Sequence, residues 1–209
     1  MTRLSTGALV LAALATLGCA ASPSQDLDPV RPPSGPIVLA RQLSFGAGVL
    51  SYEDEGFGDL DDQRVFTIDY CEPMELGALR LEGGLHWAYD DSHETVGGQD
   101  VRLRGRTFDA SVGVNLSQSF GRLRPYFGVG GSLLFLELRA VDEATDTVFD
   151  DDEVTAGAYA KAGMLFQVTR TAHVGIEFRH FEGGDVTLEG ADLDTSNDEI
   201  LFLLGTSFE

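Results

Sequence analysis

From about residue 38 to its C-terminus, the chain repeats one pattern, in which apolar and polar residues alternate over a segment and a connection follows. A period of two residues is the pattern of a β-strand with two different faces, and no segment shows the 3.6-residue apolar spacing of a helix. The segments that fit are 41–52, 63–71, 77–89, 102–117, 123–138, 154–168, 172–181 and 199–208. The sequence therefore predicts an all-β fold with eight strands.

The connections between these segments alternate in length. Short ones follow the second, fourth and sixth segments and read CEPMELG, SQSFGRL and TRTA. Long ones follow the first, third, fifth and seventh and read EDEGFGDLDD, DDSHETVGGQD, VDEATDTVFDDDE and EGGDVTLEGADLDTSND, and they hold most of the 34 acidic residues. An even number of antiparallel strands with short turns at one end and long loops at the other is typical of an outer-membrane barrel.

A soluble barrel of the lipocalin kind would show the same alternation, so the charges must decide which face is outside. A water-facing exterior should share the acidic excess of a chain with 14 basic and 34 acidic residues. The polar faces of the segments instead carry a nearly balanced set: Asp69, Arg80, Glu82, Asp109, Lys161, Glu177 and Arg179. We therefore place the polar faces inside and the apolar faces toward lipid.

The apolar faces are about five residues deep, which at the tilt of barrel strands matches a hydrocarbon band of roughly 25 Å. The expected fold is thus an eight-stranded antiparallel up-and-down transmembrane β-barrel in a bacterial outer membrane. Its lumen should be plugged, because the interior of eight strands is just wide enough for side chains. The residues expected to form a paired charge network there are Arg80, Glu82, Lys161, Glu177 and Arg179.

The glycine-rich stretch LRPYFGVGGSLLFLEL, residues 123–138, fits this arrangement. Phe127 and Phe135 share the lipid-facing parity, whereas Gly128 and Gly130 face the lumen. Small residues at these two positions leave room for long charged side chains from other strands.

The N-terminus, residues 1–19, reads as an export signal with an apolar core too short to span a bilayer. Cleavage after Gly18 would leave Cys19 as a lipid-modified terminus, because ATLGC fits a relaxed bacterial lipobox. Cleavage after Ala20 or Ala21 would remove Cys19 with the leader. Both alternatives export the chain from the cytoplasm.

Residues 20–37 hold most of the prolines and show no periodicity, so we expect an extended tether before a barrel domain at 38–209. Cys71 is the one cysteine of that domain, which excludes an intramolecular disulfide within it.

Two stretches carry a family resemblance. RPYFGVGGSLLF and GAYAKAGMLFQVTRTAHVGIEFRHF resemble strands of the small bacterial outer-membrane barrels of the OmpA-like and OmpW-like type, over residues 123–181. The resemblance implies an eight-stranded barrel in the outer membrane, and it implies little about function, because such barrels have structural, adhesive and small-solute roles. Chains of this type usually end on an aromatic residue, whereas this one ends FLLGTSFE.

The sequence offers little for catalysis or cofactors. His180 falls near the expected rim, where some barrels place a lipid-modifying hydrolase site, but Phe181 and Glu182 follow it and no H-x-S arrangement is present. The histidines lack the close spacing of a zinc site, and no cofactor motif is present. The net charge of −20 argues against nucleic acid as a partner. We therefore do not expect an enzyme.

Acidic loop residues could attract divalent cations weakly. The stretches FDDDE at 149–153 and ADLDTSNDE at 191–199 gather hard oxygen ligands, although neither is a defined calcium motif. Solvated carboxylates are the other interpretation.

The function expected is a structural or surface-interaction role with acidic loops displayed outside the cell. The alternative is a narrow pore, or a transporter or binder of small apolar ligands. A cluster of arginines adds one partner: Arg102, Arg104 and Arg106 continue the lipid-facing parity of their segment, and Arg139 lies on the same face of the next segment. Guanidinium groups suit bidentate contact with phosphate, so these four residues could bind outer-membrane lipid, including lipopolysaccharide. They could also simply extend from the barrel edge into water.

Overall fold

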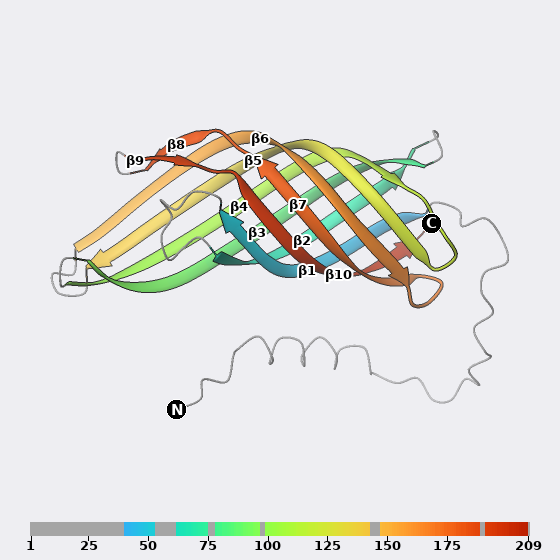
Figure 1. Cartoon of the computed structure of the whole chain (residues 1–209), viewed down its shortest axis with the longest axis horizontal. Coiled ribbons are helices and arrows are strands. Elements are labelled where there is room, and N and C mark those ends of the chain that lie inside the picture. Colours follow the sequence, from blue (N-terminus) through green and yellow to red (C-terminus); the bar gives the residue numbers. More distant parts are fainter. Residues whose placement is uncertain are drawn as a thin grey trace, which may run out of the picture. The chain divides into compact units, whose positions relative to one another are not determined.

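The structure is a computed structural model that describes residues 40–52, 62–74, 78–96, 99–142, 147–188 and 191–208. The predicted export signal with Cys19, the tether at 20–37 and the segment 53–61 lie outside the described residues. The barrel strands are β1 (Arg41–Tyr52), β2 (Asp62–Pro73), β3 (Leu79–Val96), β4 (Gln99–Ser117), β5 (Leu123–Asp142), β6 (Thr147–Gln167), β7 (Ala172–Glu182) and β10 (Asn197–Phe208). They close in the order β1-β10-β7-β6-β5-β4-β3-β2, with every neighbouring pair antiparallel (Figure 1).

This closed antiparallel barrel of eight strands confirms the predicted fold. The first and last strands pair directly, with Arg41 opposite Phe208, and this pairing removes the sheet edges of the barrel wall. The described residues contain no helix that is both long and apolar enough to cross a membrane.

The two faces of the barrel wall differ as the alternation predicts. In β2, Phe66 and Ile68 point outward and are exposed, whereas Val65 and Asp69 point inward and are buried. In β5, the eight steps from Phe127 to Phe135 cover about 20 Å along the barrel axis, at a rise of ~3.3 Å per residue and a tilt of ~40°. The outward apolar side chains therefore form a band of hydrocarbon thickness.

Four strands are longer than the sequence indicated. β3 ends at Val96 and β4 begins at Gln99, while β5 ends at Asp142 and β6 begins at Thr147. The predicted long loops DDSHETVGGQD and VDEATDTVFDDDE are therefore mostly strand. Acidic content suggested loops, but polar residues suit an antiparallel sheet outside the membrane, where cross-strand ion pairs can stabilise them. Figure 1 shows these four strands extending past the ends of β1, β2 and β7.

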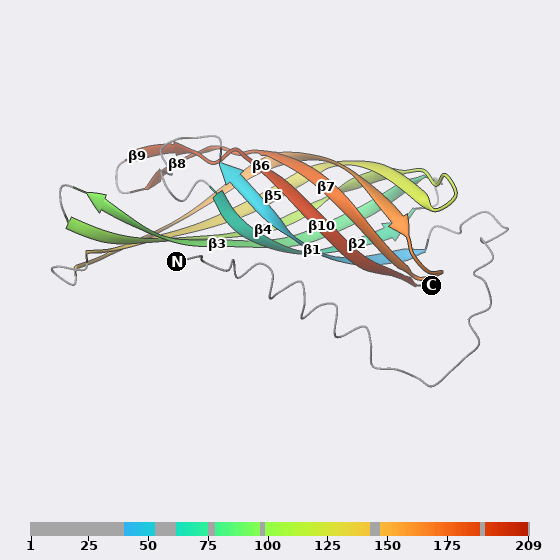
Figure 2. The same cartoon turned by 60° about the horizontal axis from the view of Figure 1, so that its bottom comes forward.

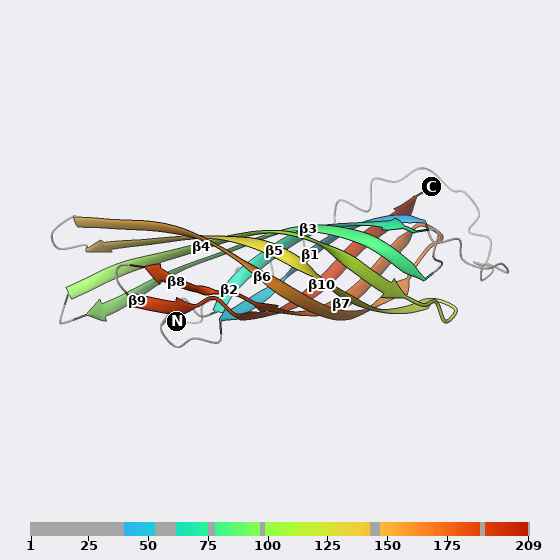
Figure 3. The same cartoon turned by 90° about the horizontal axis from the view of Figure 1, so that it is seen from above.

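The connection after β7 also differs from the predicted loop. It contains a small antiparallel hairpin, β8 (Asp185–Leu188) and β9 (Ala191–Asp194), at the same end of the barrel as the long strands (Figure 2, Figure 3). Val186 and Leu193 of this hairpin are buried and join the apolar core. Val186 and Leu193 find apolar partners only in the tertiary structure. The acidic residues around them therefore led the sequence to predict a loop.

The inward glycines of β5 lie against large side chains from other strands. A Cβ atom on Gly128 would approach Glu82 Oε1 to 2.7 Å, and one on Gly130 would approach Tyr159 Cε1 to 2.6 Å. Contacts this short do not occur in folded proteins, so these positions accept glycine because the lumen is filled from the other side. This confirms the interpretation of the glycine-rich stretch.

Candidate functional site

The middle of the barrel interior holds a buried ammonium group among carboxylates. Lys161 reaches inward from β6, and its side chain is 5% exposed. Three carboxylates surround its Nζ atom: Glu177 at 3.3 Å, Glu82 at 3.4 Å and Asp69 at 3.5 Å. Lys161 thereby joins β6 to β7, β3 and β2 across the lumen.

A second cluster lies around the guanidinium group of Arg179 on β7. Arg179 Nη2 is 2.7 Å from Asp109 Oδ2, and Nη1 is 2.9 Å from Glu199 Oε1. His86 links the two clusters, because its Nδ1 lies 2.8 Å from Glu199 Oε2 and its Nε2 lies 3.7 Å from Asp69 Oδ1. Charged groups thus form one connected chain through the barrel interior.

Arg80 is buried in the interior but stands apart from these clusters. It donates to the Gln42 side chain and to the carbonyl oxygens of Ala40, at 2.6 Å, and Cys71, at 3.4 Å. Among the described residues it forms no ion pair with a carboxylate. The prediction that Arg80 belongs to the charge network is therefore wrong. Arg80 lies near the short turns, opposite Pro73, and not at the height of the two clusters.

The residues that the predicted network lacked are Asp69, His86, Asp109 and Glu199. Glu199 is the first residue of the predicted segment 199–208. At the end of a strand, the sequence pattern does not distinguish a residue in the lumen from one at the rim. The strand begins earlier, at Asn197, and Glu199 shares its inward parity with Leu201 and Leu203. This shared parity is the signal in the sequence that could have found it.

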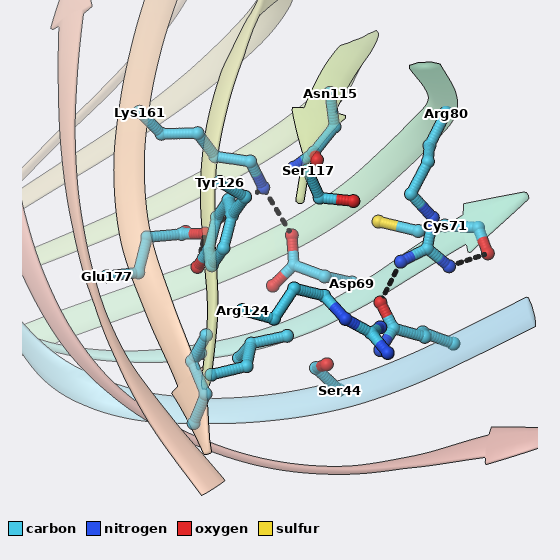
Figure 4. Close-up of a pocket in the computed structure, with 13 residues that line it drawn as sticks. Ser44, Asp69, Cys71, Arg80, Asn115, Ser117, Arg124, Tyr126, Lys161 and Glu177 are labelled. Carbon is cyan, nitrogen blue, oxygen red and sulfur yellow. Dashed lines mark hydrogen bonds and ion pairs between the residues drawn. The ribbon is translucent and has the colours of Figure 1, made fainter. Parts of the chain in front are cut away.

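Below the Lys161 cluster, toward the short turns, the interior holds a cavity of about 30 Å³. Figure 4 shows Arg80, Arg124, Lys161 and Glu177 around it. Three of these residues carry a buried polar atom without a hydrogen-bond partner among the described residues: Arg80 Nε, Arg124 Nη1 and Glu177 Oε1. The cavity is large enough for one or two water molecules. It is far too small for an organic solute.

The four predicted lipid-binding arginines lie at the loop end of the barrel wall. Asp91 of β3 pairs with Arg102, whose Nε is 2.8 Å from Oδ1, and with Arg104, whose Nε is 3.4 Å from Oδ2. Arg106 Nη1 lies 3.4 Å from Glu137 Oε1. Arg139 stands directly opposite Arg104 in the β4–β5 register.

Three of these arginines converge. A small cavity of about 20 Å³ is lined by Arg104, Arg106, Arg139 and Glu137. Arginines on adjacent strands repel each other unless an anion lies between them. The arrangement can therefore hold a small oxyanion by charge-assisted hydrogen bonds.

His180 lies at the rim on β7, and its environment is acidic. Its Nδ1 is 2.8 Å from Asp198 Oδ1 and its Nε2 is 3.4 Å from Glu182 Oε2. Among the described residues, no group of three or more histidine, cysteine, aspartate or glutamate side chains could hold a metal ion.

An outward apolar band, a polar filled interior, short turns at one end and long hairpins at the other define an outer-membrane β-barrel. The chain belongs to the family of the outer membrane protein beta-barrel domain, whose model matches residues 11–208. This confirms the resemblance to small OmpA-like and OmpW-like barrels and places the protein in the bacterial outer membrane.

Solved structures agree with this assignment. OprG from Pseudomonas aeruginosa superposes with a TM-score of 0.55 at 11% identity, over 81% of this chain and 96% of OprG. Ail of Yersinia pestis, in complex with the heparin analogue sucrose octasulfate, gives a TM-score of 0.51 at 11% identity, over 81% of this chain and 97% of Ail. Neisserial surface protein A gives 0.50 at 15% identity, over 80% and 96%. At such identities the likeness shows the fold alone. A comparison with curated protein sequences gave no significant match.

Proposed function

We propose that this barrel has a closed lumen and acts through its surface, as a non-enzymatic structural or interaction protein of the outer membrane. The observation that carries the proposal is the buried contact of Lys161 with carboxylates on three other strands. Eight strands enclose a space that such side chains fill. A solute path through this layer would have to break several buried ion pairs.

The loop-end half of the lumen adds a second, mostly apolar barrier. Phe181 is fully buried there, and Val186 and Leu193 of the β8–β9 hairpin belong to the same core. Tyr52 and Thr107 hydrogen-bond across this level, with 2.7 Å between their hydroxyl oxygens. Both layers favour a plugged barrel, and they argue against the alternative of a narrow pore that the sequence analysis retained.

Recordings from purified protein in planar bilayers test the closed lumen. We expect no large, steady conductance from the native chain. A variant with Lys161→Ala, Glu82→Ala and Glu177→Ala empties the middle layer and serves as the comparison. Steady conductance from the native protein would favour the pore or small-ligand transporter and overturn the proposal.

A lipid partner is the second part of the proposed function. The convergence of Arg104, Arg106 and Arg139 around one small cavity supports binding of a lipid phosphate, including that of lipopolysaccharide. Arg102 contributes less directly, since Asp91 already engages its guanidinium group through two hydrogen bonds. The site lies just beyond the apolar band, at the level of the lipid head groups.

The test replaces Arg102, Arg104 and Arg106 with glutamine and measures the lipopolysaccharide retained by purified protein and the melting temperature in lipopolysaccharide-containing bilayers. We expect less retained lipid and a lower melting temperature. Equal values for the variant and the native protein would mean that the arginines are only solvated.

Weak divalent-cation association at the acidic loop end completes the proposal. Asp150, Asp152 and Glu153 on β6 form no ion pair with other described residues, so their charges remain uncompensated within the described chain. Calcium titration by calorimetry should give weak heats without saturation at a defined stoichiometry. A complete absence of heat with an unchanged melting temperature would remove this element.

A further inference from the structure

A groove of about 520 Å³ crosses the outer face of β3, β4, β5 and β6 at the loop end. Its apolar floor comes from one row of cross-strand neighbours, in which Trp87 faces Phe108, Phe108 faces Phe135, and Phe135 faces Val154. The rings of Phe108 and Phe135 lie 6.0 Å apart between centroids. Aromatic side chains at this level usually mark the boundary between hydrocarbon and head groups.

The charged end of the groove changes sign from β4 to β6. Arg106 and Glu137 line both the groove and the small arginine cavity, so the two spaces adjoin. Across the β5–β6 register, Glu137 faces Asp152 and Arg139 faces Asp150. The arginines are therefore on β4 and β5, and the carboxylates are Glu137 on β5 with Asp150 and Asp152 on β6.

Part of this charge has no partner in the described protein. Arg139, Asp150 and Asp152 form no ion pair with another described residue. Adjacent strands lie about 4.8 Å apart, so the positive and negative sides are within reach of one small zwitterionic group.

We infer that this groove binds a lipid that carries a phosphoethanolamine group. The phosphate would lie among Arg104, Arg106 and Arg139, and the primary ammonium, two carbons away, would lie against Asp150 and Asp152. The acyl chain would cover the aromatic floor. The inference rests on the proposed phosphate site and adds the amine side, which that proposal does not require.

The charge pattern disfavours lipids of a single sign. A purely anionic head group would meet the carboxylates of Glu137, Asp150 and Asp152, and a purely cationic amphiphile would meet the arginines. A quaternary ammonium carries charge but donates no N–H hydrogen bond, so a phosphocholine head group should bind less well than a primary amine.

Trp87 lines the groove and is the only tryptophan of the chain, so its fluorescence reports occupancy directly. The protein is reconstituted in phosphatidylcholine bilayers that contain a fixed mole fraction of a lipid with brominated acyl chains, which quench tryptophan on contact. The brominated lipid carries either an ethanolamine, a glycerol or a choline head group. We expect at least threefold preference for the ethanolamine lipid over both others.

Three variants separate the two sides of the groove. Asp150→Asn with Asp152→Asn should abolish the preference for the ethanolamine lipid over both others while retaining binding through the phosphate that all three lipids carry. Arg104→Gln with Arg106→Gln and Arg139→Gln should lower quenching by all three lipids, because each carries the phosphate that these residues bind. Asp185→Asn, an exposed carboxylate on β8 outside the groove, is the matched control and should behave as native.

The outcomes distinguish this inference from the proposed phosphate site. Equal quenching by the ethanolamine and glycerol lipids in the native protein, both above choline, would overturn the inference and leave the phosphate site standing. Equal quenching by all three would overturn the inference. Because all three lipids carry a phosphate, the phosphate site is overturned only if the arginine variant also quenches as the native protein does. Competition by lipopolysaccharide with and without phosphoethanolamine identifies the source: stronger displacement by the modified form assigns the groove to lipopolysaccharide, and equal displacement assigns it to the phospholipid.

Discussion

His86 and Glu199 meet inside the barrel, with 2.8 Å between the imidazole Nδ1 and the carboxylate Oε2, although 113 residues separate them in the chain. His86 also lies 3.7 Å from Asp69, a partner of Lys161, and Glu199 lies 2.9 Å from Arg179. This contact therefore joins the two charge clusters. It also joins β3 to β10, which are not neighbours in the barrel wall.

Removal of Glu199 should destabilise the barrel strongly. Glu199→Ala leaves the buried Arg179 and His86 with one carboxylate fewer, and such a loss costs roughly 3–5 kcal/mol of unfolding free energy. Urea unfolding in lipid bilayers measures it. Asp185→Ala is the exposed control and should stay within about 0.5 kcal/mol of native. Equal effects would mean that Glu199 is solvated and the network is not buried.

Replacement by alanine should destabilise the barrel at Gly130 and be tolerated at the neighbouring Gly131. A Cβ at Gly130 would lie 2.6 Å from Tyr159 Cε1, whereas one at Gly131 would have its nearest atom, Gly157 O, at 3.8 Å. Gly130→Ala should lower the unfolding free energy by roughly 1–3 kcal/mol through overpacking, and Gly131→Ala should be tolerated. Unfolding curves of the two variants side by side give the comparison, and a tolerated Gly130→Ala would show a loosely packed lumen.

An arginine on the lipid face should lower the unfolding free energy strongly only within the apolar band. Val112 is 61% exposed on that face, and Val112→Arg should destabilise by roughly 2–4 kcal/mol. Val148 is 46% exposed on the long hairpin of β5 and β6, and Val148→Arg should cost about 0–1 kcal/mol there. Unfolding in bilayers measures both. Similar values would contradict the assigned position of the membrane.

The β8–β9 hairpin should contribute to stability through its apolar contacts. Leu193 is 8% exposed and packs in the core, so Leu193→Ala should cost roughly 2–5 kcal/mol as a buried large-to-small change. Hydrogen exchange should show the loss at β8, β9 and the end of β7 before the rest of the barrel. Uniform protection across all strands, with unchanged stability, would show that the hairpin is only loosely attached.

The alternation of side chains determined much of this protein without any structure. Because successive residues of a strand point to opposite faces, Phe127 and Gly128 had to lie on different sides of the wall, whatever the neighbouring strand. The alternation of short and long connections likewise required antiparallel neighbours and two unlike ends. These are local properties, and a sequence records them directly.

The meeting of particular side chains was decided by tertiary structure alone. Arg80 and Arg179 share the inward parity, yet within the described residues only Arg179 forms ion pairs with carboxylates. Strand register and barrel closure set the height of each residue along the axis. The same closure brings Glu199 to His86 across the lumen. Local alternation specifies a face and says nothing of height, so the charge clusters, the long hairpins and the β8–β9 contacts emerge only once all eight strands are aligned.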